Sequence, residues 1–340
     1  MRAIGLLALA WALAGCPGGA SEDAQGEETV GDEDIMFPDE AAAAEAPRHP
    51  ATETVAAGER ALAAGEVDEA EALFRQAVEE DAEDPRAQLD LGLVLELQND
   101  YREAEAAYRA ALRIDPDFVE ALNNLGLMLR DLDRKEEAIA MLRHAVEVEA
   151  DHGEAWLNLA LALEETGDDR GAREAYRAAV RLQPRSAVAR ANLGLLLLRV
   201  GEAEQAAIEL RRALPLARGD AAALQAIGNG LRRAGQAGAA VQAMERAIEA
   251  RGEPTPALLG ELALAHTAND DRASAERALR QALELDEGYA TAHSLLGSLL
   301  AADGRYAEAR HHMERSLALE PSGPLAERTR RQLEVVRRAQ

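Results

Sequence analysis

The chain has 340 residues, of which 48% are apolar and only 3% aromatic. This composition is neither collagenous nor broadly disordered. β-Branched and aromatic side chains, which strands need, are scarce, whereas alanine is abundant. A core of this length normally divides into domains unless the fold grows by repetition. We therefore expect an all-helical protein.

Charge limits the classes of partner. The chain has 37 Lys and Arg against 62 Asp and Glu, for a formal net charge of −25. Such a chain repels phosphates, so nucleic acid is not expected as a partner. The single cysteine excludes an intramolecular disulfide and a metal site built from cysteines.

The N-terminal residues resemble a bacterial lipoprotein signal. Arg2 precedes a short apolar run that is too short to span a bilayer, and the run ends in Leu13-Ala14-Gly15-Cys16. This ending resembles the lipobox, which implies cleavage after residue 15 and lipidation of Cys16. The alternative is an ordinary signal peptide with a chance cysteine. We expect a signal peptide at 1–15 and anchoring to a bacterial envelope membrane, with the outer membrane facing the periplasm favoured over the inner membrane.

An acidic segment follows the cysteine. Residues 17–50 contain ten Asp and Glu, and Arg48 is their only fixed cation. Low hydrophobicity and high charge predict that 16–50 is a disordered acidic tether. Its only apolar cluster, Ile35-Met36-Phe37, is either a chance cluster or a docking motif.

From Ala51 onward the chain repeats with a period of 34 residues, apart from one step of 35. The predicted repeats are 51–84, 85–118, 119–152, 153–186, 187–220, 221–255, 256–289 and 290–323. Gly or Ala recurs at the eighth position, Ala at the twentieth, and Ala or Ser at the twenty-seventh, with large apolar residues between them. This pattern predicts that each repeat forms two amphipathic helices that pack closely together. Each pair must then stack on the neighbouring pairs.

The repeat resembles the tetratricopeptide family. The fourth copy matches its pattern at Trp156, Leu159-Ala160, Leu163, Ala172, Tyr176, Ala179 and Pro184. The resemblance implies an all-α tetratricopeptide-repeat superhelix, an α-solenoid of about eight helix-turn-helix units. The extra residue falls within 252–256 and predicts a joint between two sub-arrays. Residues 324–340 are expected to form a capping helix, with a basic docking site as the alternative.

No catalytic constellation is visible. The histidines lack metalloprotease spacing, and no glycine-rich phosphate loop follows a strand. We therefore expect no enzymatic activity, no metal and no cofactor.

The resemblance implies a concave surface lined by the first helices, which binds extended or helical peptide. At the sixth, ninth and twelfth repeat positions we expect amide or carboxylate groups, an apolar floor and flanking charges. These residues are Asp90, Asn124, Asn158 and Asn192; Leu93, Leu127, Leu161 and Leu195; and Glu96, Arg130 and Glu164. Side-chain amides can pair with a peptide backbone whatever its sequence. Alternatively, the leucines only pack between adjacent helices.

Together these features predict a membrane-anchored adapter of the bacterial envelope that holds a peptide or protein partner of unknown identity. It is similar to the tetratricopeptide lipoproteins that assist pilus, secretin or peptidoglycan-hydrolase assembly. Two alternatives remain open. One is a self-associating scaffold, and the other is a non-catalytic subunit of an envelope glycosyltransferase, protease or peptidoglycan hydrolase.

Overall fold

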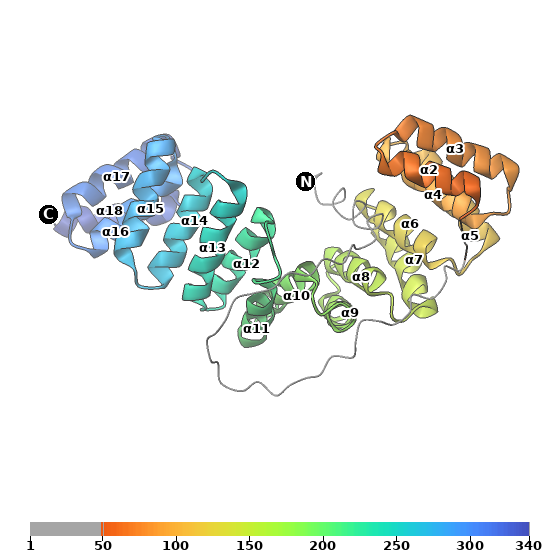
Figure 1. Ribbon diagram of the computed structural model, residues 1–340. Helices are drawn as coiled ribbons and strands as arrows, with labels where there is room; N and C mark the ends of the chain where they lie inside the picture. Colours follow the sequence, from red (N-terminus) through yellow and green to blue (C-terminus); the bar gives the residue numbers. More distant parts are fainter. Residues whose placement is uncertain (1–48, 50, 340) are drawn as a thin grey trace, which may run out of the picture. The chain divides into compact units, whose positions relative to one another are not determined.

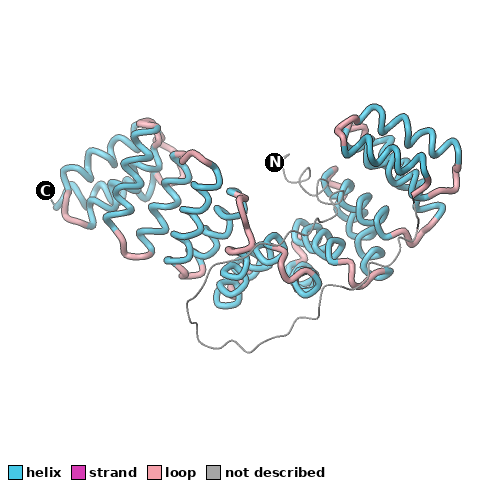
Figure 2. Tube along the Cα trace, in the orientation of Figure 1, coloured by secondary structure: helices cyan, strands magenta, loops and turns pink. Residues whose placement is uncertain are grey.

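The computed structural model describes residues 49 and 51–339 (Figure 1). These residues contain 17 helices and no strand, which confirms the predicted all-α, tetratricopeptide-type class (Figure 2). The chain divides into two compact units, residues 1–125 and 126–340, and the division falls inside one helix. Each unit is therefore a set of helices with its own core.

The first unit consists of paired helices joined by short turns. Its helices are α2 (Glu53–Ala63), α3 (Val67–Glu80), α4 (Pro85–Leu97), α5 (Tyr101–Ile114) and the first part of α6 (Val119–Asp131). Helix α2 packs on α3, α4 packs on α5, and α3 also contacts α4. The apolar side chains Phe74, Leu95 and Tyr108 are fully buried between these helices.

The second unit continues the same pairing to the C-terminus. Its helices after α6 are α7 (Lys135–Val148), α8 (Gly153–Glu165), α9 (Asp169–Leu182), α10 (Ala187–Arg199), α11 (Ala203–Ala213), α12 (Ala221–Arg233), α13 (Ala237–Arg251), α14 (Pro256–Ala268), α15 (Arg272–Leu285), α16 (Ala290–Ala302), α17 (Tyr306–Leu319) and α18 (Ala326–Ala339). One apolar cluster runs through this unit from Ala191 to Val336.

Small residues on the first helix of a pair face large residues on the second. A Cβ added to Gly92 would lie 2.6 Å from the ring of Tyr108, and one added to Gly297 would lie 2.7 Å from Cγ of Met313. The same relation joins Gly126 to Leu142. The glycines are therefore required because a larger side chain would force the two helices apart.

The second helix of every pair buries its own small residues. The alanines at the twentieth repeat position have no exposed surface; they are Ala70, Ala104, Ala138, Ala172, Ala206, Ala240, Ala275 and Ala309. At the twenty-seventh position Ser316 replaces the alanine and is also buried. The periodic small residues thus mark the contact between helices within each unit.

The turn within each pair uses the left-handed backbone region. Gly167 has φ of +82° and Gly304 has φ of +75° at this position, whereas Asn99, Asp133 and Asp270 occupy it with φ of 67°, 61° and 57°. Glycine takes this conformation without a steric cost, and Asn and Asp tolerate it better than other residues. The turn geometry is therefore kept although the residue varies.

The predicted joint at 252–256 is wrong. Gly252 ends α13 with φ of +83°, and Thr255 caps α14 by accepting a hydrogen bond from Leu258 N at 3.3 Å. Met244 and Leu258, on either side of the inserted residue, belong to one buried cluster. The loop therefore absorbs the insertion without interrupting the core.

A different irregularity lies at the end of α11. This helix stops at Ala213, and Pro215 follows where other second helices continue. Proline lacks the N–H that helix continuation needs, so the chain turns early. Arg246 on α13 then donates to the carbonyl of Leu214 at 2.8 Å, which satisfies a backbone acceptor that α11 leaves unpaired.

The last helix, α18, packs on α16 and α17. It buries Thr329, Leu333 and Val336. The Thr329 and Ser294 hydroxyls lie 2.7 Å apart in this contact, and Ser298 Oγ donates to Gln332 at 2.8 Å. The contact between α16 and α18 is therefore partly polar, whereas the contacts within pairs are chiefly apolar.

Candidate partner-binding surface

The sixth-position residues do not share one environment. In the first unit, the Asp90 side chain on α4 is buried, with 4% of the residue exposed. Arg86 Nε donates to Asp90 Oδ2 at 3.0 Å, and Arg86 Nη2 donates to Glu59 Oε1 on α2 at 2.6 Å. Burial raises the pKa of the Asp90 carboxyl to about 7, although Arg86 acts against this rise. Asp90 is therefore held in an internal ion-pair network between α4 and α2.

The asparagines at the same position are more accessible. Asn124, in the first unit, is half-buried, and its Oδ1 accepts a long hydrogen bond of 3.4 Å from Asn123. Asn158 and Asn192, in the second unit, are also half-buried. Asn192 forms no hydrogen bond with any other described residue through its side chain. Its amide is thus available to an incoming polar group.

The predicted apolar floor is half-buried in every copy. Leu93, Leu127, Leu161 and Leu195 each keep part of their surface exposed. Leu195 also contacts the next helix pair, because a Cβ on Gly230 of α12 would lie 3.0 Å from Leu195 Cδ2. This leucine therefore combines packing between adjacent helices with an exposed edge.

The predicted flanking charges already have partners. Glu96 accepts from the Tyr108 hydroxyl at 2.8 Å. Glu164 accepts from the Tyr176 hydroxyl at 2.7 Å and from Arg199 at 3.0 Å.

Arg130, the third flanking charge, donates to Asp131 at 2.8 Å and lies 3.8 Å from Glu165. All three charged side chains are therefore held in place by partners within the protein. Because these charges are partly neutralised, they would orient a bound partner more than they would strengthen its binding.

Tyr108 and Tyr176 lie beside these charges, although the sequence analysis named no tyrosine among the site residues. Desolvation is the first cause of the raised pKa of both Tyr108 and Tyr176, and the carboxylates of Glu96 and Glu164 add to it. A neutral phenol that donates to a carboxylate is the stable arrangement here. The signal in the sequence is a tyrosine twelve residues after a glutamate within one repeat, which occurs in the second and fourth copies.

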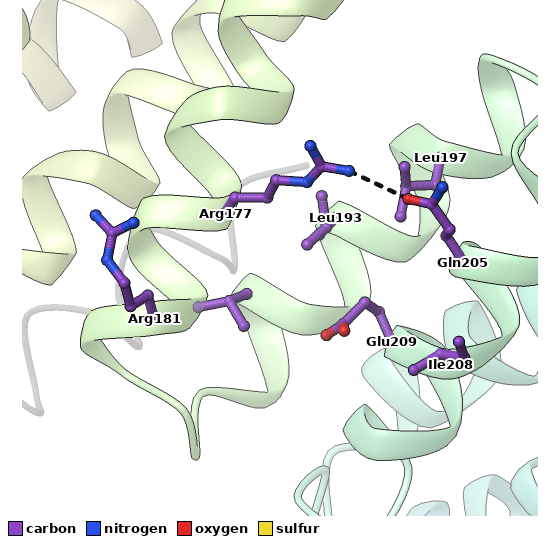
Figure 3. A pocket seen from close by; sticks show the side chains of 8 residues that line it. Arg177, Arg181, Leu193, Leu197, Gln205, Ile208 and Glu209 are labelled. Atoms are coloured by element: carbon purple, nitrogen blue, oxygen red, sulfur yellow. Dashed lines mark hydrogen bonds between the residues drawn. The ribbon is translucent and has the colours of Figure 1, made fainter.

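The second unit also contains a shallow recess of about 270 Å³ on the side formed by α9, α10 and α11 (Figure 3). The lining residues are Arg177, Val180, Arg181, Leu193, Leu197, Gln205, Ile208 and Glu209. Arg177 spans the recess and donates to Gln205 Oε1 at 3.1 Å (Figure 3). The leucines supply an apolar floor, and Ile208 leaves 50% of its surface exposed beside it.

No group of three or more His, Cys, Asp or Glu among the described residues could hold a metal ion. Within residues 51–339, no helix has the length and apolar character that crossing a bilayer requires. Cys16, the signal peptide and most of the acidic tether lie outside the described residues.

Family comparisons agree with the repeat pattern. The tetratricopeptide repeat family profile matches residues 169–221 and 261–324, and the profile of the cilia and flagella-associated protein 70 middle TPR-like domain matches residues 56–183. Together the matches cover more than half of the chain. The chain belongs to the tetratricopeptide-repeat (TPR) family. No curated protein sequence is similar enough to count as a relative of this TPR protein.

Several solved structures are similar to the TPR protein. The matched chain of the APC/C hetero-tetramer Cut9–Hcn1 is 18% identical with a TM-score of 0.49, over 79% of this chain and 52% of that one. Yeast Tom70 is 17% identical with a TM-score of 0.48, over 89% and 67%. YrrB, described as a TPR protein with an unusual peptide-binding site, is 22% identical with a TM-score of 0.45, over 58% and 97%. The TPR protein thus spans about half the length of the Cut9–Hcn1 chain that it matches.

Proposed function

We propose that this TPR protein is a lipid-anchored adapter of the bacterial cell envelope that holds a peptide segment of a partner protein against its first helices. Membership of the TPR family supports an interaction scaffold. TPR proteins are generally non-catalytic adapters. The proposed partner is therefore a protein or peptide.

The side chain of Asn192 is the observation that carries the proposal. Its amide is half-buried on α10 and unpaired among the described residues, and Leu195 lies three residues further along the same helix face. A partly desolvated amide can both donate to and accept from a peptide backbone. The adjacent leucine offers apolar area to the side chains of that peptide.

A half-buried asparagine with a half-buried leucine three residues later is also found at Asn158 with Leu161 and at Asn124 with Leu127. Asp90 differs because Arg86 occupies its carboxylate, so we assign it a structural role. In the sixth repeat Ala226 takes the asparagine position. The proposed binding residues are therefore the three asparagines and their leucines. The charged side chains of Glu96, Arg130 and Glu164, which are already paired within the protein, flank them.

Site-specific photo-crosslinking in cells tests this surface. A photoreactive amino acid at position 158 or 192 should capture a discrete protein, whereas the same group at position 226 is the matched control. For the captured partner, the combined change Asn124→Ala, Asn158→Ala and Asn192→Ala should weaken binding by tens of fold. Each lost amide contact contributes about 0.5–1.5 kcal/mol. Equal affinity of the triple variant and wild type would contradict the proposal.

The membrane part of the proposal depends on Cys16, the only thiol of the chain. Cys16→Ser should abolish labelling by a palmitate analogue and partition into detergent. Persistent labelling would contradict lipid anchoring. Light scattering of the purified protein separates a scaffold that binds partners from one that associates with itself, because only the latter changes mass with concentration.

A further inference from the structure

The recess of α9, α10 and α11 lies within the second unit, between the second helices of the fourth and fifth repeats. Arg177 and Arg181 project from α9 and Ile208 projects from α11 (Figure 3), while α10 contacts both helices and supplies Leu193. The asparagines of the proposed binding surface do not line this recess. It is therefore a separate surface of the second unit.

Arginines at the repeat position of Arg177 are neutralised in other copies. Arg75, Arg109 and Arg280 occupy this twenty-fifth position, and each pairs with a glutamate four residues earlier, at 2.7, 2.9 and 2.7 Å. Arg75 and Arg280 also lie 2.8 and 3.6 Å from a glutamate of the following repeat. Two carboxylate positions thus surround an arginine at this place in the repeat.

Arg177 lacks both of these carboxylates. Arg173 stands four residues earlier and Gln205 stands in the following repeat, where those three copies have glutamate. The only hydrogen bond of Arg177 to a described residue goes to the neutral Gln205 side chain, at 3.1 Å. Arg181, one turn further along α9, forms no hydrogen bond or ion pair with any described residue. The rim therefore carries two cations that no carboxylate of the described chain neutralises.

The remaining lining groups leave this charge in place and add apolar surface. The Glu209 carboxylate is paired with Arg190 at 2.7 Å and lies 3.4 Å from Arg212. Ile208 leaves 50% of its surface exposed, whereas the other copies have Ala, Glu, Gln, Arg or His at this repeat position. The recess thus combines two available cations with an exposed apolar side chain that the other repeats lack.

The local charge favours an acidic ligand although the whole chain is acidic. Residues 169–218 contain ten arginines and five carboxylates, whereas the whole chain has a net charge of −25. At physiological ionic strength the Debye length is about 8 Å, so a ligand in the recess responds mainly to the charges around it.

The size and spacing of the recess fit a peptide. Its volume of about 270 Å³ is below the range of about 300–1,000 Å³ that is usual for pockets that enclose a whole small ligand. Side chains of an extended peptide alternate between two faces, and those on one face lie about 7 Å apart. Arg177 and Arg181 are one helix turn apart, a spacing of about 5–6 Å between their Cβ atoms. Successive carboxylates on one face of such a peptide can therefore reach both arginines.

We propose that the recess binds an extended acidic segment of a partner protein in which acidic and apolar residues alternate. The carboxylates pair with Arg177 and Arg181 on the α9 side. The apolar side chains, on the opposite face of the segment, cover Ile208 on the α11 side. This site is additional to the asparagine surface and does not depend on it.

The test titrates a fluorescent synthetic peptide, Ser-Glu-Leu-Glu-Leu-Glu-Ser, against the full chain and follows its anisotropy. The peptide should bind saturably, and its counterpart with glutamine in place of glutamate should bind about tenfold more weakly. Arg177→Gln with Arg181→Gln should also weaken binding about tenfold, since each partly exposed ion pair contributes modestly. Ile208→Ser should weaken binding severalfold. These side chains are exposed, so circular dichroism should show unchanged helix content.

Two control variants locate the site. Arg328→Gln with Arg331→Gln removes the same charge from exposed arginines of α18 and should bind the peptide as the wild type does. The triple asparagine variant should do the same. A photoreactive leucine in the peptide should crosslink to α9–α11.

Three results would overturn the proposal. The first is the absence of saturable binding to the wild type, and the second is equal binding by the two arginine variants. The third is weakened binding in the triple asparagine variant alone, which would place the peptide on the first-helix surface. None of these results bears on capture of a partner at positions 158 and 192.

Discussion

The helix pairs α4–α5 and α16–α17 use the same small-to-large packing but bury different polar groups. Gly92 faces Tyr108 in the first pair, and Gly297 faces Met313 in the second. The buried titratable group is the Asp90 carboxyl in α4 and the His293 ring in α16. The small residue is thus a shared requirement of the helix contact, whereas each buried polar group depends on partners that its own pair provides.

The two buried groups respond to acid in opposite directions. Burial raises the pKa of Asp90 to about 7, so its folded form binds a proton more readily than the unfolded chain. His293 Nδ1 lies 2.9 Å from His312 Nδ1, and desolvation lowers the pKa of both rings, that of His312 to about 4. The folded α16–α17 pair therefore resists protonation, whereas α4 accepts it.

Replacing the glycine that both pairs share at the eighth repeat position by alanine should have the largest effect on the free energy of unfolding. Gly92→Ala places a Cβ 2.6 Å from the Tyr108 ring and should lower the free energy of unfolding by about 1–3 kcal/mol, as overpacking does. Gly297→Ala should act similarly, since the backbone oxygen of Ala309 lies 3.1 Å from the new Cβ. Urea denaturation measures both losses.

Gly260→Ala is the control for this change. Gly260 lies inside α14, and an added Cβ would lie no closer than 3.5 Å to Tyr289. Alanine should therefore stabilise the helix by about 0.5–1 kcal/mol. A loss as large as that of Gly92→Ala would show that the close contact is not what requires glycine.

The histidine pair should give the next largest effect. Its stability is fully present above the unfolded histidine pKa of 6.5 and is lost as the pH falls toward 4. After allowance for solvent screening, we expect a loss of about 1–2 kcal/mol in α16–α17. Hydrogen exchange of these helices at several pH values, compared with His312→Gln, measures it.

The pH dependence of stability expected from Asp90 has the opposite sign to that expected from the histidine pair. The contribution of this carboxyl to stability is greatest below its unfolded pKa of 3.8 and is lost as the pH rises to about 7. Asp90→Asn should therefore remove a pH dependence in α4 that opposes the one in α16–α17. The same slope for both helices in wild type would contradict the comparison.

The tyrosine hydroxyls should have a smaller effect. Tyr108→Phe and Tyr176→Phe each remove a hydrogen bond to a carboxylate, and we expect losses of about 0.5–1.5 kcal/mol in thermal or urea unfolding. The loss should be smaller at Tyr176, because Glu164 keeps its bond to Arg199. The reverse order would show that Arg199 does not compensate.

Substitutions in the left-handed turn should have the smallest effect on the free energy of unfolding. Asp133 has φ of 61° at a position where other repeats have glycine. Asp133→Gly should raise the free energy of unfolding by about 0.5 kcal/mol because the strain of a side chain is removed. Gly167→Ala, at the equivalent turn with φ of +82°, should lower it instead.

The fold could be predicted because its determinants recur. Gly92 and Ala104 occupy positions that repeat every 34 residues, and both lie in the helix contact that their spacing predicts. The partners of buried polar groups do not recur. Asp90 stands where three other repeats have asparagine, and its ion pair with Arg86 one turn earlier accompanies its burial.

The error at 252–256 has a similar cause. An inserted residue suggests a break, but Met244 and Leu258, on either side of the loop, belong to one buried cluster, so the core continues. The recess of α9–α11 also lacked a periodic signal, because Ile208 and Arg181 come from different repeats. Periodicity thus predicts contacts within a repeat better than features that arise between repeats.

Sequential packing of the helices has a mechanical consequence. From α7 onward each helix contacts mainly the helices next to it in the chain. A pulling force applied at the two ends would therefore detach helix pairs one after another, starting at an end. Each pair that yields releases 34 residues, or about 115 Å of extended chain, so the TPR array can lengthen in steps while its remaining pairs stay folded.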